Sequence, residues 1–170
     1  MLDFPEEKVA VAGVAGPLRL DDVLYVAKKS NRIGPLQAVR ADRVLGTDHV
    51  RSAALHAHRA EAEGRMQAKT IEVEFVRYLA GERQIRSALD KMGLADAAPG
   101  AAVVALGPKR TDALQHFLHS LAPKEDDSLL DARESKLIDY GIPMQAIAAT
   151  TPARRMDLVL EAVAAVDLMR

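Results

Sequence analysis

The chain has 170 residues, 49% of them hydrophobic and 28% charged, and a formal net charge of −1. This length and apolar content predict a single domain, 1–170, with one sizeable core. The absence of cysteine excludes a disulfide scaffold, a thiol nucleophile and cysteine-based zinc sites, and it agrees with a reducing cytoplasm.

The sequence also lacks the features of an exported or membrane-spanning chain. Residues 1–5 include Asp3 and no basic leader, and no run of about eighteen apolar residues occurs. We therefore expect a cytoplasmic protein with no membrane partner.

Charge is distributed unevenly along the chain. Residues 28–43 carry five cations and one acid, whereas residues 125–139 carry six acids and two cations. The first run indicates a surface that attracts phosphate, and the second a surface that repels it. Ordinary solvated surface gives the same pattern, and composition does not separate the two interpretations.

The first part of the sequence predicts two strands that alternate with two helices. Valines alternating with small residues predict a strand over 9–14, and Asp21 is placed to cap the helix after it. The run 36–45 predicts a weaker strand. A long helix then extends over 47–63, and its inner positions are mostly alanine, which permits close packing on a sheet.

Two short amphipathic helices joined by Gly81 are predicted over residues 69–93. Apolar residues recur at spacings of three, four and seven and form one buried stripe on each helix: Ile71, Phe75, Tyr78 and Leu79 on the first, and Ile85, Leu89 and Met92 on the second. Gly81 and Gly93 each follow the last apolar position, where a glycine in the left-handed conformation ends a helix. The outer positions are cationic: Lys69, Arg77, Arg83, Arg86 and Lys91.

The rest of the sequence predicts one more strand and several helices. A continuous apolar run over 101–106 is typical of a buried central strand, and a helix with an apolar inner side follows over 111–121. The acidic segment 124–139 predicts a loop and then a short helix. The last helix, 152–169, has a wide apolar face that suits either the core or a partner protein.

Catalytic and metal-binding motifs are missing. The sequence contains no phosphate-binding glycine loop, no nucleophile elbow and no His-Glu-x-x-His. His116 and His119 lie three residues apart on a predicted helix but have no evident third ligand. Asp126 and Asp127 stand in an acidic loop where nothing apolar raises a carboxyl pKa. We predict no catalytic residue, no metal and no cofactor, although the sequence leaves a Ser-His-Asp site open.

Four segments resemble one family in their order and spacing. They are Gly-Thr-Asp-His-Val-x-x-Ala at 46–53, Lys-Thr-Ile-Glu-Val-Glu-Phe-Val-Arg-Tyr-Leu-Ala-Gly at 69–81, Arg-Gln-Ile-x-x-Ala-x-x-x-Met-Gly-Leu at 83–94, and Ala-Val-Val-Ala-Leu at 102–106. In this pattern the sequence resembles the small kinase-binding accessory subunit of the KEOPS complex, the PRPK-binding protein family in its archaeal type. The layout agrees over residues 8–170, with the motifs concentrated in 46–106.

The resemblance implies an α+β fold, with a small mixed, largely antiparallel sheet surrounded by helices, and a protein that is not an enzyme. It also implies partners. Members of that family dock on the N-lobe of a small atypical kinase, which binds the subunit that installs threonylcarbamoyl on adenosine beside the tRNA anticodon. Archaeal-type members also hold the tRNA 3′ CCA end. The acidic segment 125–139 departs from the family pattern in its length.

Single-stranded RNA is recognised through phosphate charge, base stacking and hydrogen bonds, and the chain offers candidates for each. The RNA-binding candidates are Lys69, Arg77, Arg83 and Arg86, with Arg43 and Arg51 as flanking charges and His49 as a stacking or hydrogen-bonding partner. The competing interpretation makes them surface cations in acid–base pairs, such as Arg77 with Glu74, each contributing only about 0.3 to 0.5 kcal/mol.

The apolar face of the last helix provides the candidates for kinase docking. They are Met156, Val159, Leu160 and Val163, joined by Tyr25 if the two ends of the chain meet. Burial of the same residues in the core is the competing interpretation.

Two other functions remain open at this point. One is a DNA-binding regulator with the helix at 82–93 as its recognition helix, although an isoelectric point near 6.5 and the buried strand at 101–106 argue against it. The other is a small enzyme without a recognisable motif.

Overall fold

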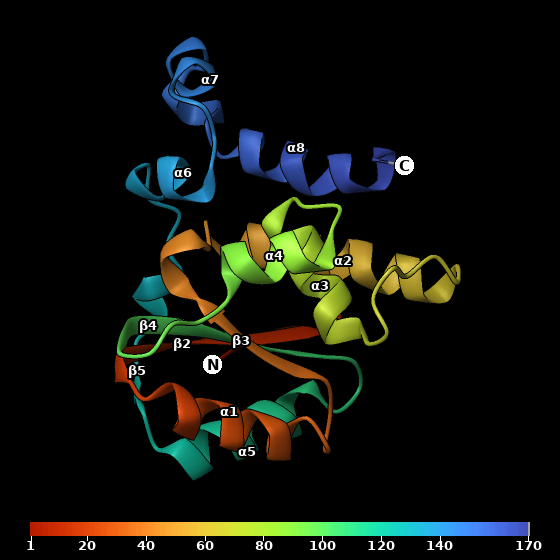
Figure 1. Cartoon of the computed structure of the whole chain (residues 1–170), viewed down its shortest axis with the longest axis vertical. Coiled ribbons are helices and arrows are strands. Elements are labelled where there is room, and N and C mark those ends of the chain that lie inside the picture. Colours follow the sequence, from red (N-terminus) through yellow and green to blue (C-terminus); the bar gives the residue numbers. More distant parts are fainter. Residues whose placement is uncertain (170) are drawn as a thin grey trace.

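The computed structural model describes residues 1–169 and contains an open sheet with helices on both faces (Figure 1). The strands are β1 (Leu2–Phe4), β2 (Val9–Leu18), β3 (Leu36–Arg40), β4 (Ala98–Leu106) and β5 (Lys124–Glu125). Their order is β1-β2-β4-β3, with β5 paired to β2 beyond the end of β1. All pairs among the described strands are antiparallel, which confirms the predicted α+β class.

The helices form a layer on each face of this sheet and a further layer at one end of the molecule. The α-helices are α1 (Leu20–Ser30), α2 (Thr47–Ala62), α3 (Ile71–Ala80), α4 (Ile85–Met92), α5 (Arg110–Leu121), α6 (Ser135–Tyr140), α7 (Met144–Ala149) and α8 (Asp157–Ala165). The 3₁₀ turns are η1 (Ala41–Arg43), η2 (Asp127–Leu130), η3 (Pro152–Arg154) and η4 (Val166–Leu168). Helices α1 and α5 cover one face of the sheet, α2, α3 and α4 lie over the other, and α8 packs on α2 and α3 from outside (Figure 1).

The central strand β4 is buried on both sides, which is why its sequence is continuously apolar. Ala102, Val104 and Leu106 belong to the core cluster shared with α2 and α3, whereas Ala101 and Val103 face the cluster shared with α1 and α5. Successive side chains of a strand point to opposite faces, so a strand covered twice needs apolar residues at every position. The predicted central strand at 101–106 is confirmed.

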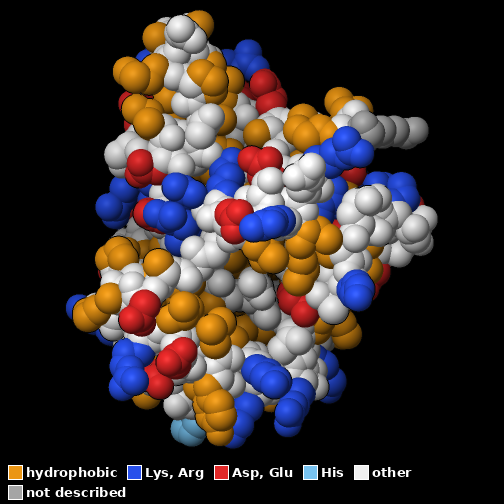
Figure 2. Space-filling view, viewed as in Figure 1, with side chains coloured by type: hydrophobic (Ala, Val, Ile, Leu, Met, Phe, Trp, Pro, Cys, Tyr) orange, Lys and Arg blue, Asp and Glu red, His pale blue; other side chains and the backbone are white. Residues whose placement is uncertain are grey.

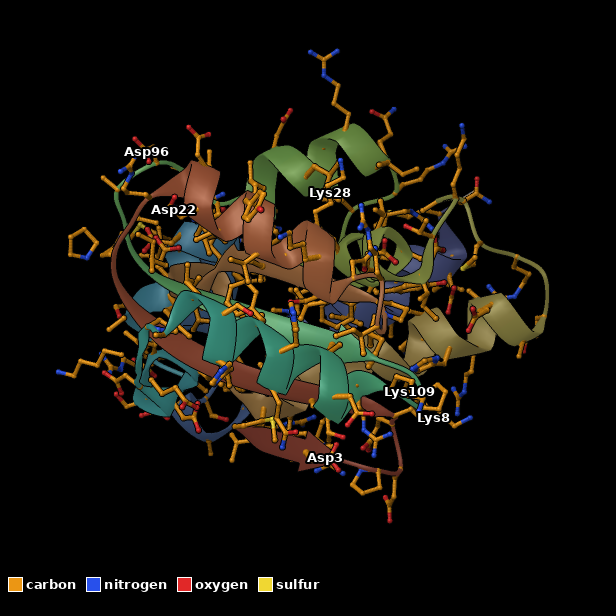
Figure 3. The ribbon with its side chains drawn as sticks, turned by 90° about the horizontal axis from the view of Figure 1, so that it is seen from below. Asp3, Lys8, Asp22, Lys28, Asp96 and Lys109 are labelled. Carbon is orange, nitrogen blue, oxygen red and sulfur yellow. The ribbon has the colours of Figure 1, made fainter. Side chains whose placement is uncertain are left out.

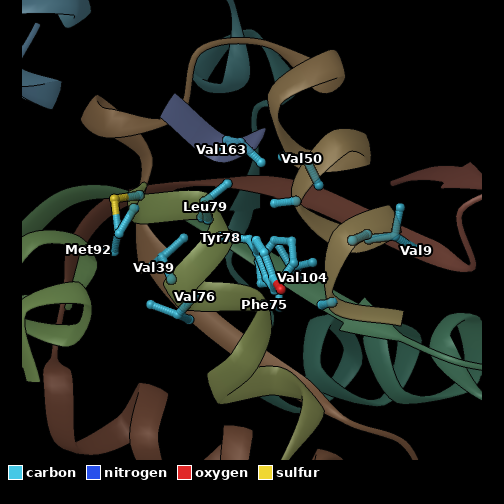
Figure 4. Close-up of a cluster of buried hydrophobic side chains, with 14 of the residues drawn as sticks. Val9, Val39, Val50, Phe75, Val76, Tyr78, Leu79, Met92, Val104 and Val163 are labelled. Carbon is cyan, nitrogen blue, oxygen red and sulfur yellow. The ribbon is translucent and has the colours of Figure 1, made fainter. Parts of the chain in front are cut away.

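Helix α3 supplies the largest side chains of the core (Figure 4). Its predicted stripe is confirmed, since all four positions are at most 7% exposed: Ile71, Phe75, Tyr78 and Leu79. The helix ends as expected at Gly81, which has a φ of 66° in the left-handed region. The predicted stripe on α4 is confirmed at Met92, which is buried, and wrong at Leu89, which is 36% exposed, because α4 turns Ala88 inward in its place.

Several predicted boundaries differ from the structure. The strand predicted over 36–45 ends at Arg40, where the chain turns into η1, and the helix predicted over 152–169 is divided into η3, α8 and η4. Gly93 has a φ of −63°, so it does not end α4 through a left-handed conformation. A side chain there would meet the carbonyl oxygen of Leu89 at 2.5 Å, so Gly93 is required for a close approach of the backbone.

The acidic segment 125–139 folds onto the sheet instead of forming a solvated loop. The Asp127 carboxylate accepts the N–H of Gly13 at 2.9 Å, and the Asp126 side chain caps η2 by accepting the N–H of Ser128. A side chain at Gly13 would lie 2.2 Å from the Asp126 carbonyl oxygen. These acids therefore hold the segment in place, which the sequence alone did not predict.

Candidate functional site

The residues predicted to bind RNA fall into an exposed group and a group held inside the protein. The exposed members are Lys69, Arg83 and Arg86. The others are buried or half-buried and bonded internally: His49, Arg77, Arg43 and Arg51. The structure therefore brings only part of the predicted set to the surface.

A buried ion pair on α3 determines where two of the exposed cations lie. Arg77 and Glu74 are bonded at 2.6 Å, with side-chain exposures of 4% and 0%. Glu74 also accepts the backbone N–H groups of 67–68, and Arg77 Nε donates to the Arg83 carbonyl oxygen at 2.8 Å. The pair thus fixes both the segment that leads to Lys69 and the turn that carries Arg83. Arg77 is a positioning residue, which corrects its predicted contact with RNA.

His49 is also placed inside the protein, so its predicted stacking on RNA is corrected. Its Nδ1 accepts the N–H of Leu45 at 3.1 Å, and its Nε2 donates to the carbonyl oxygen of Leu79 at 2.8 Å. Only the neutral ring with its proton on Nε2 satisfies both partners. Burial accordingly lowers the pKa of His49 to about 4.

Arg43 and Arg51 are likewise engaged by the fold. Arg43 Nη1 donates to the Lys91 carbonyl oxygen at 2.6 Å. Arg51 is bonded to Glu7 at 2.8 Å and stacks over the Phe4 ring at 5.0 Å. Neither guanidinium is free to act as a flanking charge for RNA without breaking these contacts.

The basic run 28–43 does not form one surface patch either. Arg40 is paired with Asp42 at 2.7 Å, and Arg43 is turned toward α4. On the α1 and α5 layer, Asp22 and Asp96 lie toward one end and Lys109 toward the other (Figure 3). Arg40 and Arg43 are therefore removed from the run, and Lys28, Lys29 and Arg32 remain exposed on α1 and in the turn after it.

A hollow of about 460 Å³ lies beside Arg83, between α3 and the end of α8. Its lining residues are Arg65, Gln67, Arg77, Tyr78, Arg83, Val166, Asp167 and Met169. Sequence reasoning missed Arg65, Gln67 and Asp167. Arg65 follows α2, whereas Asp167 lies more than a hundred residues later, so only tertiary packing brings them together.

Asp167 joins three elements around this hollow. Its carboxylate accepts the hydroxyl of Tyr78 at 2.6 Å, and it lies 2.9 Å from His56 Nδ1 and 3.2 Å from Arg65 Nη1. Burial and the adjacent Asp167 raise the pKa of Tyr78 to about 12, so its hydroxyl stays protonated and donates. Arg65 also pairs with Glu63. The hollow is therefore lined by three guanidinium groups. Arg65 is paired with Glu63 and Asp167, and Arg77 with Glu74, whereas Arg83 forms no ion pair within the described chain.

The predicted kinase-docking residues are not on one surface. Val159 and Val163 are 1% and 0% exposed and belong to the core. Met156 and Leu160 are half-buried on the same helix. Tyr25 is 63% exposed, but it lies on α1, across the sheet from α8 (Figure 1). The condition under which Tyr25 would join this surface, that the two ends of the chain meet, is therefore not met by α1 and α8.

Exposed apolar side chains do gather on the layer formed by α6, α7 and α8. Ile138 is 55% exposed and Met144 is 70% exposed. Figure 2 shows apolar side chains over this end of the molecule. A contiguous patch of exposed apolar side chains on a monomer marks a contact surface more often than a single exposed apolar residue does.

The histidines do not assemble a metal or catalytic site in the described part of the chain. His116 Nδ1 lies 2.8 Å from the hydroxyl of the buried Ser30, and His119 is exposed. Among residues 1–169, no three His, Cys, Asp or Glu side chains are placed to hold one metal ion. Within the same residues, no helix has the length and apolarity needed to cross a membrane.

The fold and these surfaces define a small α+β binding protein with a cationic hollow on one side and an apolar layer at one end. The family model of the kinase binding protein CGI-121 matches residues 21–150 of the chain. The protein therefore belongs to this kinase-binding family, the family of a KEOPS subunit, and the resemblance drawn from its sequence is confirmed. No curated protein matches the chain. The matched residues include Lys69, Arg83 and Arg86 and end before α8.

The depressed pKa of His49 predicts a specific loss of stability in acid. The unfolded chain, with an ordinary pKa near 6.5, takes up the proton first, so stability is complete above about pH 6.5 and falls as pH decreases to about 4. The expected loss is about 3 kcal/mol in the free energy of unfolding, measured by denaturant titration across this range. His49→Asn should remove this fall in the free energy of unfolding with decreasing pH. The variant His119→Asn, at an exposed site, should keep the wild-type slope of the free energy of unfolding against pH. Equal slopes in His49→Asn and wild type would contradict the assignment.

Removal of one partner of the buried ion pair should be far more costly than removal of both. Glu74→Gln leaves the Arg77 guanidinium buried without its counter-charge, and we expect a loss of about 3 kcal/mol in the free energy of unfolding. The double variant Glu74→Leu, Arg77→Met should lose less than Glu74→Gln alone. The single variants for comparison are Glu74→Leu and Arg77→Met. If their losses in the free energy of unfolding add up to the loss of the double variant, the two charges do not depend on each other.

Proposed function

We propose that this protein is the non-catalytic subunit of a KEOPS tRNA-modification complex, where it binds the atypical kinase subunit and the 3′ CCA end of tRNA. Through the kinase it is an indirect partner of the threonylcarbamoyl-transferase subunit. The observation that carries the RNA assignment is the buried Glu74–Arg77 pair, which positions Lys69 and Arg83 on either side of α3 within the matched family segment.

The cationic hollow has the character expected of a site for an RNA end. Its volume of about 460 Å³ falls within the range of roughly 300 to 1,000 Å³ occupied by small ligands. Arginine binds phosphate through two parallel N–H groups and also stacks on bases through its planar face. Arg83, which forms no ion pair within the described chain, supplies both capacities, and the exposed Lys69 and Arg86 add charge in the neighbouring segments. Arg65 would contribute only by exchanging its bonds to Glu63 and Asp167 for a phosphate.

The scarcity of exposed aromatic side chains limits the affinity that stacking contributes. Tyr78 lines the hollow but is 2% exposed, and its hydroxyl is bonded to Asp167. Recognition would therefore rest on charge and guanidinium contacts, which makes the binding strongly dependent on salt.

For the kinase, we place the docking surface on the layer of α6, α7 and α8. Met144 and Ile138 are exposed apolar groups on α7 and α6, and Leu160 is half-buried on α8. Apolar anchors of this kind carry most of the energy at protein interfaces. Tyr25 is the alternative anchor, on the other side of the sheet.

Charge reversal at Lys69 and Arg83 should weaken tRNA binding without unfolding the protein. Each lost contact with a single-strand phosphate removes about 0.7 from the slope of log affinity against log salt, so the double variant should lose about 1.4. Fluorescence anisotropy with tRNA at several salt concentrations measures this slope.

The matched control is Arg19→Glu, Lys124→Glu, which makes the same change of net charge at exposed positions elsewhere. Unchanged affinity in the Lys69, Arg83 double variant would contradict the RNA site. Equal affinity for intact tRNA and for tRNA trimmed of its CCA end would show that the protein does not recognise that end. Tighter binding of duplex DNA would favour the regulator that uses the helix at 82–93.

Acidic substitutions in the apolar layer should weaken binding to the kinase. We expect Met144→Asp, Leu160→Asp to weaken binding of the purified KEOPS kinase by roughly tenfold or more, since a buried interfacial anchor contributes at least 1 to 2 kcal/mol. Surface plasmon resonance measures the affinity, and Tyr25→Asp is the control on the opposite layer. A loss confined to Tyr25→Asp would move the interface to α1.

A further inference from the structure

A second hollow, of about 400 Å³, lies where β3 leaves the sheet. The last residue of β3, Arg40, pairs with Ala101 of β4, and the chain then turns away into η1. Strand β4 begins earlier, at Ala98, so its first residues have β2 beside them on one side only. Helix α6 closes the space on the far side, and the hollow shares no lining residue with the one at Arg83.

A buried lysine without a counter-charge lines this hollow. Lys136 is 8% exposed, and its Nζ donates to the carbonyl oxygens of Val44 at 2.8 Å and Leu129 at 2.6 Å. No carboxylate among residues 1–169 lies within 4.0 Å of this ammonium, and its third hydrogen has no acceptor among those residues. An ammonium removed from water without an opposite charge is costly, and burial accordingly lowers the pKa of Lys136.

Of the other charges around the hollow, one pair is neutralised, and two carboxylates, Asp96 and Asp139, have no ion pair within the described chain. Arg40 and Asp42 form a bidentate pair at 2.7 and 2.8 Å, which leaves that wall neutral. Asp96 accepts the backbone N–H of Leu20 at 2.9 Å. Of the remaining lining charges, Asp139 is exposed and forms no ion pair within the described chain.

Arg133 is the second cation at this hollow that has no carboxylate partner in the described chain. It is exposed, and its guanidinium reaches only the Ser128 carbonyl oxygen, at 3.4 Å. The hollow is also lined by apolar residues, namely four alanines with Pro99 and Leu129, which we call its apolar floor. Two unpaired cations next to an apolar concave surface are the complement of an amphipathic anion.

We propose that this hollow binds a small molecule that carries a carboxylate or phosphate group on an apolar body. The anionic group lies between Lys136 and Arg133 and supplies the counter-charge that Lys136 lacks. The apolar body covers the apolar floor and removes it from water. Because two carbonyl oxygens already hold Lys136 Nζ, the ammonium needs no reordering to accept the anion.

The test is a titration of ¹⁵N-labelled protein with benzoate, phenyl phosphate, inorganic phosphate and neutral benzyl alcohol, followed by amide chemical shifts. We expect saturable shifts at residues 98, 100, 135 and 136 with benzoate or phenyl phosphate. Inorganic phosphate, which lacks the apolar body, and benzyl alcohol, which lacks the charge, should bind more weakly. The stronger of the two aromatic anions identifies whether the natural group is a carboxylate or a phosphate.

Arg133→Glu should weaken this binding roughly tenfold, the effect of losing one charge-assisted hydrogen bond. Arg133 is exposed, so this variant keeps the fold, whereas Lys136→Met also removes two bonds to the backbone. Arg59→Glu, on α2, makes the same charge change away from the hollow and should bind like wild type.

Three outcomes would overturn the proposal. Shifts that grow linearly at millimolar anion without saturation would show that there is no site. Equal affinities in Arg133→Glu and Arg59→Glu would show that Arg133 takes no part. Binding of benzyl alcohol as tight as that of benzoate would show that the hollow recognises apolar surface alone.

Discussion

The structure depends on the need to satisfy the backbone groups at the two ends of a buried helix. The last turn of α3 lies inside the protein, where water does not reach its free carbonyl oxygens. Leu79 receives hydrogen bonds from His49 of α2 and Tyr140 of α6, and Ala80 receives one from Lys91 of α4. A cation at a helix C-terminus also opposes the helix dipole. Three elements distant in sequence are therefore fixed around one helix end.

The beginning of α3 is organised by the same requirement, and there it has a functional consequence. The Glu74 carboxylate takes up the free N–H groups of 67–68, and its charge is balanced by Arg77. Arg77 in turn bonds the turn that precedes α4. The backbone of the segment that leads to Lys69 and that of the turn with Arg83 are thereby both bonded to a pair in the core. A cation on a fixed backbone loses less entropy on binding than one on a mobile loop, which is what a weak, charge-based RNA contact requires.

The layer at the C-terminal end links the two proposed surfaces. Helix α8 packs on α2 and α3 through Val163 and on α6 through Val159, and η4 brings Asp167 to the rim of the cationic hollow. Tyr78, His56 and Arg65 hold that carboxylate. In the proposed arrangement, a kinase would contact α6, α7 and α8, and an RNA end would contact η4, which follows α8 directly. The hollow at Lys136 is built differently, because its cation is held by carbonyl oxygens and lacks a carboxylate partner.

Sequence by itself determined the elements and their inner faces. The continuous apolar run in β4, the stripe on α3 and the left-handed Gly81 follow from local sequence pattern and backbone geometry, which act within one segment. Tertiary structure alone decided which polar positions remain outside. Arg77 lies one turn from Glu74, a spacing typical of an exposed pair, yet it is buried, because the segments at 67–68 and Arg83 close over it. Periodicity defines a face relative to its own helix and carries no information on which later segment covers that face.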